Sequence, residues 1–140
     1  MAAPASDGRN VASPVGYYTY VVPDDVWLWS DGIYELHGYA PQTVPPTTER
    51  LLRHKHPDDR AMAYEVLETA VLDGRPFSCC HRIIDSNRRV RSVLSVGRGV
   101  RGDDGKVERL VGFLVDLTEA SRTDGEVATL ETLSRVRQRV

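Results

Sequence analysis

Residues 56–74 constrain this chain most, because they carry the signals for both ends of one helix and for its buried face. Pro57 suits the first helical position, where a backbone N–H has no intrahelical partner, and Asp58 and Asp59 place negative charge beside the free amides of the first turn. Gly74 can adopt the left-handed conformation that ends a helix. The apolar residues recur at helical spacing on one face: Ala63, Val66, Leu67, Ala70 and Val71. That face needs a cover, and the segments that follow can provide it.

After Gly74 the apolar pattern changes to the two-residue period of β-strands. Residues 77–84 and 90–96 alternate along their length, and residues 107–117 are dense in Val, Leu and Phe. Turn-forming residues at 85–88 and 102–105 separate the three runs. Strands joined by such short turns predict an antiparallel meander that packs against the helix.

The residues before the long helix predict a hairpin and two short helices. Residues 15–22 and Val26–Trp29 favour strands, and a proline with two aspartates forms the turn between them. We expect Ser30 to cap a short helix that Gly38 ends, and Thr48–Arg53 to add a further turn or two. The pattern predicts an α+β fold, with an antiparallel sheet of about five strands, helices packed on one face and a C-terminal helix.

Length and charge fit one globular domain with no general affinity for nucleic acid. The chain has 140 residues, of which 41% are hydrophobic and 27% charged, and its net charge is −2. Cys79 and Cys80 are neighbours on a predicted strand, so their side chains point to opposite faces and we expect no disulfide between them. No segment approaches the roughly 18 apolar residues of a membrane helix. We therefore predict a cytoplasmic protein with no membrane part and a disordered leader over residues 1–14.

The residues from 116 onward predict a final helix. Asp116 and Thr118 offer capping chemistry, and the helix is expected to run over residues 119–140. Its narrow apolar stripe is typical of a dimer seam or of a signalling helix. The stripe consists of Leu130, Leu133, Val136 and Val140.

Several short motifs, in this order and at this spacing, resemble the PAS domain family, in particular the subgroup whose long helix opens with His-Pro-Asp-Asp-Arg. The resemblance covers residues 15–122 and places a PAS-like sensory domain at 15–118. The matching residues are Trp29-Ser30, Glu35-Leu36-His37-Gly38-Tyr39, His56-Pro57-Asp58-Asp59-Arg60, His81-Arg82-Ile83, Val111-Gly112-Phe113 and Asp116-Leu117-Thr118.

The resemblance implies a sensory or interaction module rather than an enzyme. A small ligand or a protein partner would change the packing between sheet and long helix, and Asp116 and Thr118 would pass the change to the C-terminal helix. Such domains commonly precede a histidine kinase, a phosphatase, a cyclic-nucleotide enzyme or an RNA-binding antiterminator. We favour the antiterminator, because residues 133–140 are rich in arginine. We expect a homodimer that contacts nucleic acid only through an output domain.

The ligand site is open at this point. Trp27, Trp29, Tyr34, Phe77, Cys79 and His81 either line a pocket or fill the core. Haem ligation by His54, His56 or His81 is not expected, because a lone histidine is more often hydrogen-bonded structure than a ligand. Flavin-adduct photochemistry is not expected either, because the flavin-binding motif of the family needs a cysteine before the long helix and this chain has none there.

Two other classes of function compete with a ligand sensor. One is a dimerisation module that binds no ligand. The other is a small enzyme that uses the acids after His56, although this cluster has neither a nucleophile nor a second set of metal ligands beside it. We therefore expect no catalytic residue and no metal site.

Overall fold

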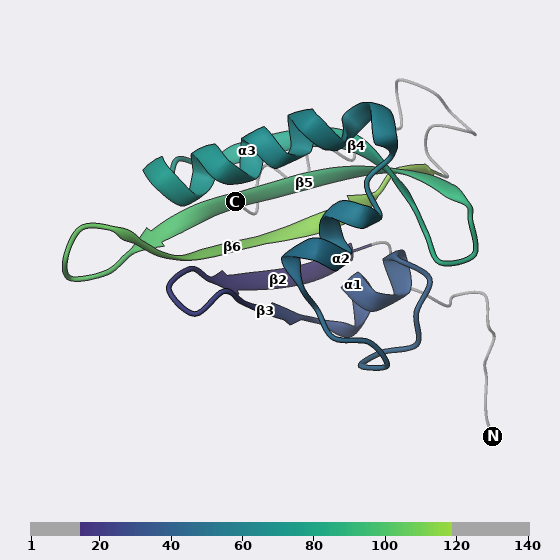
Figure 1. Ribbon diagram of the computed structural model, residues 1–140, viewed down its shortest axis with the longest axis horizontal. Coiled ribbons are helices and arrows are strands. Elements are labelled where there is room, and N and C mark those ends of the chain that lie inside the picture. The colour runs from purple at the N-terminus through teal and green to yellow at the C-terminus, as the bar shows by residue number, and fades with distance from the viewer. Residues whose placement is uncertain (1–14, 119–140) are drawn as a thin grey trace.

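The computed structural model describes residues 15–118, which form a β-sheet with helices on one face (Figure 1). Within these residues, five antiparallel strands lie in the order β3-β2-β6-β5-β4. The strands are β2 (Val15–Val21), β3 (Val26–Trp29), β4 (Phe77–Ile84), β5 (Val90–Arg101) and β6 (Val107–Asp116). The helices are α1 (Asp31–Leu36), α2 (Thr48–Arg53), the 3₁₀ turn η2 (Pro57–Asp59) and α3 (Arg60–Asp73). The predicted α+β fold with about five antiparallel strands is confirmed.

The long helix begins and ends where the sequence predicts. Pro57 opens η2, and the ring nitrogen Nδ1 of His56 accepts a hydrogen bond from the backbone N–H of Asp58 at 3.1 Å. The side chain of His56 therefore caps the start of the helix. At the other end Gly74 has a φ of 70°, the left-handed conformation that glycine adopts without steric cost.

The helix face of the sheet carries most of the core. Ala70 of α3 packs with Val107 and Leu110 of β6. Beside them, α1 and the sheet contribute a second buried group, made of Ile33, Leu36, Ile83, Val93 and Leu114. Helix α1 lies directly on β2, because Gly16 of the strand and Gly32 of the helix meet where they touch. A Cβ on Gly16 would stand 2.4 Å from the backbone nitrogen of Ile33.

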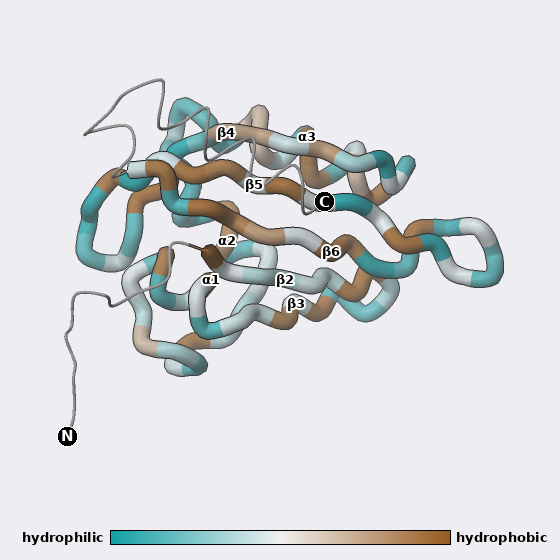
Figure 2. The backbone as a smooth tube through the Cα atoms, turned by 180° about the vertical axis from the view of Figure 1, so that it is seen from behind, coloured by the Kyte–Doolittle hydropathy of each residue, from teal (hydrophilic) through white to brown (hydrophobic). Residues whose placement is uncertain are grey.

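A further apolar cluster occupies the opposite face of the sheet. Successive residues of a strand point to opposite faces, so Leu114 belongs to the helix face and Val115 to the other. Figure 2 shows that hydrophobic residues follow one another along much of β5 and β6, as strands with an apolar cluster on each face require. The cluster consists of Leu94, Val96, Val115 and Leu117, with Val15 and Phe113 packed against it.

One local prediction is wrong. Ser30 precedes α1 but makes no side-chain cap; its Oγ instead accepts a hydrogen bond from the backbone N–H of Tyr17 at 2.9 Å, which ties the end of β3 to β2. The leader over residues 1–14 and the helix over 119–140, with its stripe of Leu130, Leu133, Val136 and Val140, lie outside the described residues. Among the helices described, none is long and apolar enough to cross a membrane.

Candidate ligand pocket and relay network

A pocket of about 60 Å³ lies between the sheet and helices α2 and α3. Both walls are mostly apolar, because the inward face of each strand and the inward stripe of α3 meet here. An engineered cavity of about 150 Å³ holds benzene, and this pocket has less than half that volume. A flavin ring or a haem therefore does not fit the pocket as it stands. Its lining comprises Tyr18, Trp27, Trp29, Ile33, Leu51, Leu52, Lys55, Ala63, Val66, Leu67, Phe77, Cys79, His81, Ser95 and Leu114.

Five of the six side chains named from the sequence as pocket candidates line this space: Trp27, Trp29, Phe77, Cys79 and His81. The sixth, Tyr34, is buried behind the lining and packs edge-on against Trp29, with ring centroids 5.2 Å apart. Tyr34 therefore supports the wall without forming it.

Lys55, the one cation among the lining residues, is not predicted by the sequence as part of the pocket. It is only 6% exposed, and no residue in the described part of the chain forms a hydrogen bond or ion pair with its ammonium group, which keeps a slight contact with solvent. Burial lowers the pKa of Lys55 to about 8. Its backbone pairs with Ile83 of β4, and this bridge pulls the residue under the sheet. The surrounding polar run shows no apolar periodicity, so a solvent-exposed loop is what the sequence suggests there.

Two other polar atoms of the lining residues have no partner among the residues described. Trp29 Nε1 and His81 Nε2 are buried and have no hydrogen-bond partner within residues 15–118, whereas Trp27 Nε1 donates to Thr48 Oγ1 at 2.8 Å. Burial, followed by the positive charge of Lys55, lowers the pKa of His81 to about 3, so its ring is neutral. The lining contains no aspartate and no glutamate.

Cys79 supplies a thiol to the lining but no obvious reactivity. Burial raises its pKa above the ordinary value, although Lys55 acts in the opposite direction. Its Sγ lies 3.2 Å from Met62 Sδ, a contact that fits packing. Cys80 is exposed on the other face of the strand, and both cysteines are free, as the strand geometry predicts.

Of the two acids at the start of the long helix, Asp59 is held in a structural ion pair, whereas the Asp58 side chain is mostly exposed. Asp59 accepts hydrogen bonds from the backbone and the guanidinium of Arg82, the shortest at 2.8 Å. These bonds hold the pKa of Asp59 well below its usual range. The pair fastens the start of the helix to β4. Both carboxylate oxygens of Asp59 already accept hydrogen bonds from Arg82, so neither is free for acid–base chemistry. Within residues 15–118, no three His, Cys, Asp or Glu side chains come together as a metal site.

The histidines suggested as haem ligands are also engaged or enclosed. His54 Nδ1 donates to the carbonyl of Ile84 at 2.6 Å, and its Nε2 lies 2.8 Å from Tyr39 Oη. His56 caps η2. Of the three, only His81 reaches the pocket.

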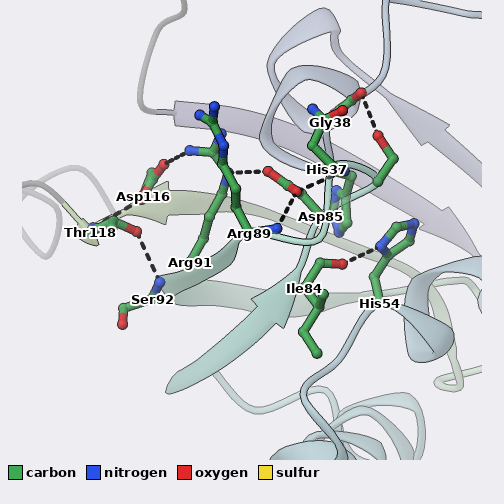
Figure 3. A network of polar contacts seen from close by, with 12 residues as sticks. His37, Gly38, His54, Ile84, Asp85, Arg89, Arg91, Ser92, Asp116 and Thr118 are labelled. Atoms are coloured by element: carbon green, nitrogen blue, oxygen red, sulfur yellow. Dashed lines mark hydrogen bonds and ion pairs between the residues drawn. The ribbon is translucent and has the colours of Figure 1, made fainter.

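A chain of contacts begins at the pocket wall and leads away from it. Trp29 stacks on His37, the residue that follows α1, with ring centroids 5.6 Å apart and planes inclined by 8°. The carbonyl of His37 accepts a hydrogen bond from Ser86 N at 2.8 Å, and Gly38 O accepts one from Ser86 Oγ at 2.6 Å. The end of α1 is thus bonded to the β4–β5 turn (Figure 3).

The contacts continue from that turn to the end of the sheet. Arg91 donates to Asp85 and to Asp116, both at 2.9 Å, and so bridges the turn to the last residue of β6. Asp116 Oδ1 accepts from Thr118 N at 2.9 Å, while Thr118 Oγ1 accepts from Ser92 N at 3.0 Å (Figure 3). Asp116 and Thr118, named from the sequence, therefore belong to one network.

Asp85 anchors this network from a buried position. Burial by itself would raise its pKa, but hydrogen bonds from the backbone of Arg89, from Arg91 and from the backbone of Asn87 together lower it. The carboxylate is therefore charged at neutral pH and fixed by its donors. A shift at either end of the turn has to move these bonds.

The five-stranded antiparallel sheet with its helices on one face defines a sensory domain of the PAS class. The family model described as PAS fold matches residues 26–114, which is more than half of the chain, and the chain belongs to this family. A sensory fold of this kind is typically non-catalytic.

Relatives of known name contain such domains within longer proteins. The chain is 25% identical, over 113 residues, to the probable diguanylate cyclase DgcE of Escherichia coli (strain K12), covering 81% of this chain and 10% of that protein. The chain therefore spans about a tenth of this curated relative.

Solved structures share the fold at low sequence identity. An RNA-binding light-oxygen-voltage receptor superposes with a TM-score of 0.71 at 22% identity, over 90% of this chain and 36% of that one. The N-terminal domain of a diguanylate cyclase with PAS/PAC sensor from Marinobacter aquaeolei gives 0.70 at 18%, over 77% and 99%. A sensory box histidine kinase/response regulator from Burkholderia thailandensis E264 gives 0.67 at 22%, over 88% and 92%.

Proposed function

We propose that this domain is a small-molecule sensor that binds its ligand in the pocket and relays the change through Asp116 and Thr118 to an output domain. The observation that carries the proposal is the contact between Trp29 and His37. A ligand that moves the Trp29 ring also moves the residue whose carbonyl holds the β4–β5 turn. From that turn, Arg91 reaches Asp116 directly.

The output of the relay is a separate part of the proposal. We propose an RNA-binding antiterminator, supported by the arginine-rich residues 133–140 and by the fold shared with an RNA-binding receptor. Histidine kinases and diguanylate cyclases among the similar proteins are the competing outputs. The domain is proposed to work in the cytoplasm, as its free cysteines suit.

Native mass spectrometry of the purified protein, with its visible absorption spectrum, tests the sensor directly. A retained molecule of defined mass is expected, and its displacement should follow a change that fills the pocket. Ala63 lines the pocket and is 8% exposed, so Ala63→Leu should expel the ligand. Ala61 lies on the exposed side of the same helix, so Ala61→Leu is the matched control. Full retention by a folded Ala63→Leu protein would contradict the proposed site.

The second candidate, a homodimerisation module, is favoured by the apolar residues on the outer face of the sheet. Tyr17 and Leu28 point to that side and are 54% and 57% exposed, next to the cluster that includes Phe113. We propose that this face joins two copies of the domain. Sedimentation at tens of micromolar is expected to show a dimer that Leu28→Glu splits, while a monomeric wild type would exclude it.

A further inference from the structure

The pocket has the charge of an anion receptor. One ammonium group, that of Lys55, lines it, and the lining contains no carboxylate to neutralise that charge. A buried ion without a partner is costly, because protein groups replace its water shell only partly. A bound anion could therefore supply the negative charge that the lining lacks.

A further donor lies in the same wall. Trp29 Nε1 can only donate, and within residues 15–118 it finds no acceptor. His81 Nε2 is also buried without a partner there, but its neutral ring can donate through only one of its two nitrogens. A carboxylate has two oxygens with about four acceptor positions between them, so it can satisfy an ammonium and an N–H donor together.

The remaining wall and the volume set the rest of the ligand. Leu51, Ala63, Val66 and Leu114 surround the space with apolar surface. The volume of about 60 Å³ leaves room for only a few heavy atoms besides ordered water. We propose, resting on the sensor function above, that the ligand is a short-chain monocarboxylate whose carboxylate pairs with Lys55 and Trp29 and whose alkyl end faces α3.

We expect Lys55 to be the group in this pocket that changes its charge near pH 8. Its ammonium faces Cys79 and His81 of β4, His37 beyond α1 and Tyr18 of β2, and α3 offers it only apolar side chains. His37 and His81 are neutral because burial lowers the pKa of each to about 3, and burial raises the pKa of Tyr18 to about 12. The nearby acid, Asp59, is paired with Arg82.

The test compares propionate with propionamide, which has nearly the same shape and no charge. Titrations are followed by the indole N–H signals of the two tryptophans, of which Trp27 already donates to Thr48. Both rings line the pocket, so propionate should shift the Trp29 signal more than that of Trp27, because only the Trp29 N–H gains an acceptor. Propionamide should bind at least tenfold more weakly. Trp29→Phe assigns the signals.

Lys55→Met removes the charge and keeps the length of the side chain. Propionate affinity should fall by about tenfold to a hundredfold, while Lys106→Met, a change of the chain's other lysine on an exposed turn, should leave it unchanged. In the wild type, affinity should fall about tenfold per pH unit above pH 8, because Lys55 loses its proton there and propionate keeps its charge.

The other possible results refute the carboxylate ligand, and they differ in whether they also refute the sensor function. Equal binding of propionamide, or full propionate affinity in folded Lys55→Met, would refute the carboxylate and still show a small-molecule pocket. Binding of neither probe by the wild type would also refute it, and a neutral molecule retained in the native mass spectrum would then leave the sensor standing. If nothing is retained and nothing binds, both proposals fail.

Discussion

Replacing Lys55 with methionine should stabilise the ligand-free protein at neutral pH. Burial lowers the pKa of Lys55 from 10.5 to about 8, which means that the folded state holds this proton less tightly than the unfolded chain does. Each unit of that difference corresponds to about 1.36 kcal/mol, so keeping the ammonium buried costs on the order of 3 kcal/mol below pH 8. Methionine fills the same apolar space without that cost.

The sign of the pH dependence follows from proton counting. Between about pH 8 and pH 10.5 the unfolded chain binds the Lys55 proton and the folded protein does not, so wild-type stability gains from Lys55 as pH rises through this window. The advantage of Lys55→Met should therefore be largest below pH 8 and should disappear by about pH 10.5. Groups that do not interact with Lys55 titrate alike in both proteins, so their effects cancel in the difference; Cys79, whose pKa burial raises and the charge of Lys55 lowers, adds a smaller contribution of its own.

Urea denaturation followed by tryptophan fluorescence measures that difference at pH 7, 9 and 10.5, in buffers free of carboxylates. The midpoint of Lys55→Met should exceed that of the wild type at pH 7 with an unchanged slope, and Lys106→Met should match the wild type throughout. A difference that stays constant with pH, or a destabilised Lys55→Met at pH 7, would refute the reasoning, because it would mean that the Lys55 ammonium has a stabilising partner.

Three further changes test other parts of the structure. In Gly112→Ala the new Cβ would stand 2.2 Å from the carbonyl oxygen of Val96, so it should lower the free energy of unfolding by about 3 kcal/mol or more, whereas Gly105→Ala meets nothing within 4 Å and should cost only the 1–2 kcal/mol or so of a left-handed backbone; similar urea midpoints would contradict this. Asp59→Asn should destabilise the protein at pH 7, and because the pKa of Asp59 is lowered in the fold, the gap to wild type should close as acid protonates the carboxylate; a gap unchanged at pH 3 would count against the ion pair. Asp116→Asn should weaken amide protection at Thr118 with the sheet intact, and unaltered hydrogen exchange would remove it from the relay.

The sequence predicts most of the fold because its local signals agree with one another. Proline and glycine mark the ends of the long helix, and alternation marks β4 and β5. Val26–Trp29 is a strand as predicted, since an apolar run follows a turn with aspartates. These signals are local, so no knowledge of the tertiary structure is needed to interpret them.

The predictions fail where a distant partner decides. The sequence predicts Ser30 as a helix cap, but its hydroxyl oxygen accepts a hydrogen bond from the backbone N–H of Tyr17 on the neighbouring strand. Aromatic, cysteine and histidine side chains are the pocket candidates in the sequence, and one of them, Tyr34, packs against Trp29 instead of lining the pocket. Lys55 sits in a polar run and is buried through its pairing with Ile83, 28 residues further along. No local pattern carries that information.

The unpaired lysine and the relay can be parts of one device. A folded domain has only about 5–15 kcal/mol of stability in total, so the cost of burying Lys55 is a large share of it. A carboxylate that pairs with Lys55 returns part of this cost and stabilises the domain in proportion to ln(1 + [L]/Kd). The same ligand satisfies the indole of Trp29, which stacks on His37, so the energy of binding acts on the first contact of the chain that reaches Asp116. Ligand sensing and the stabilisation that the ligand gives should therefore be lost together in Lys55→Met. Asp116→Asn should lose the relay and keep ligand binding.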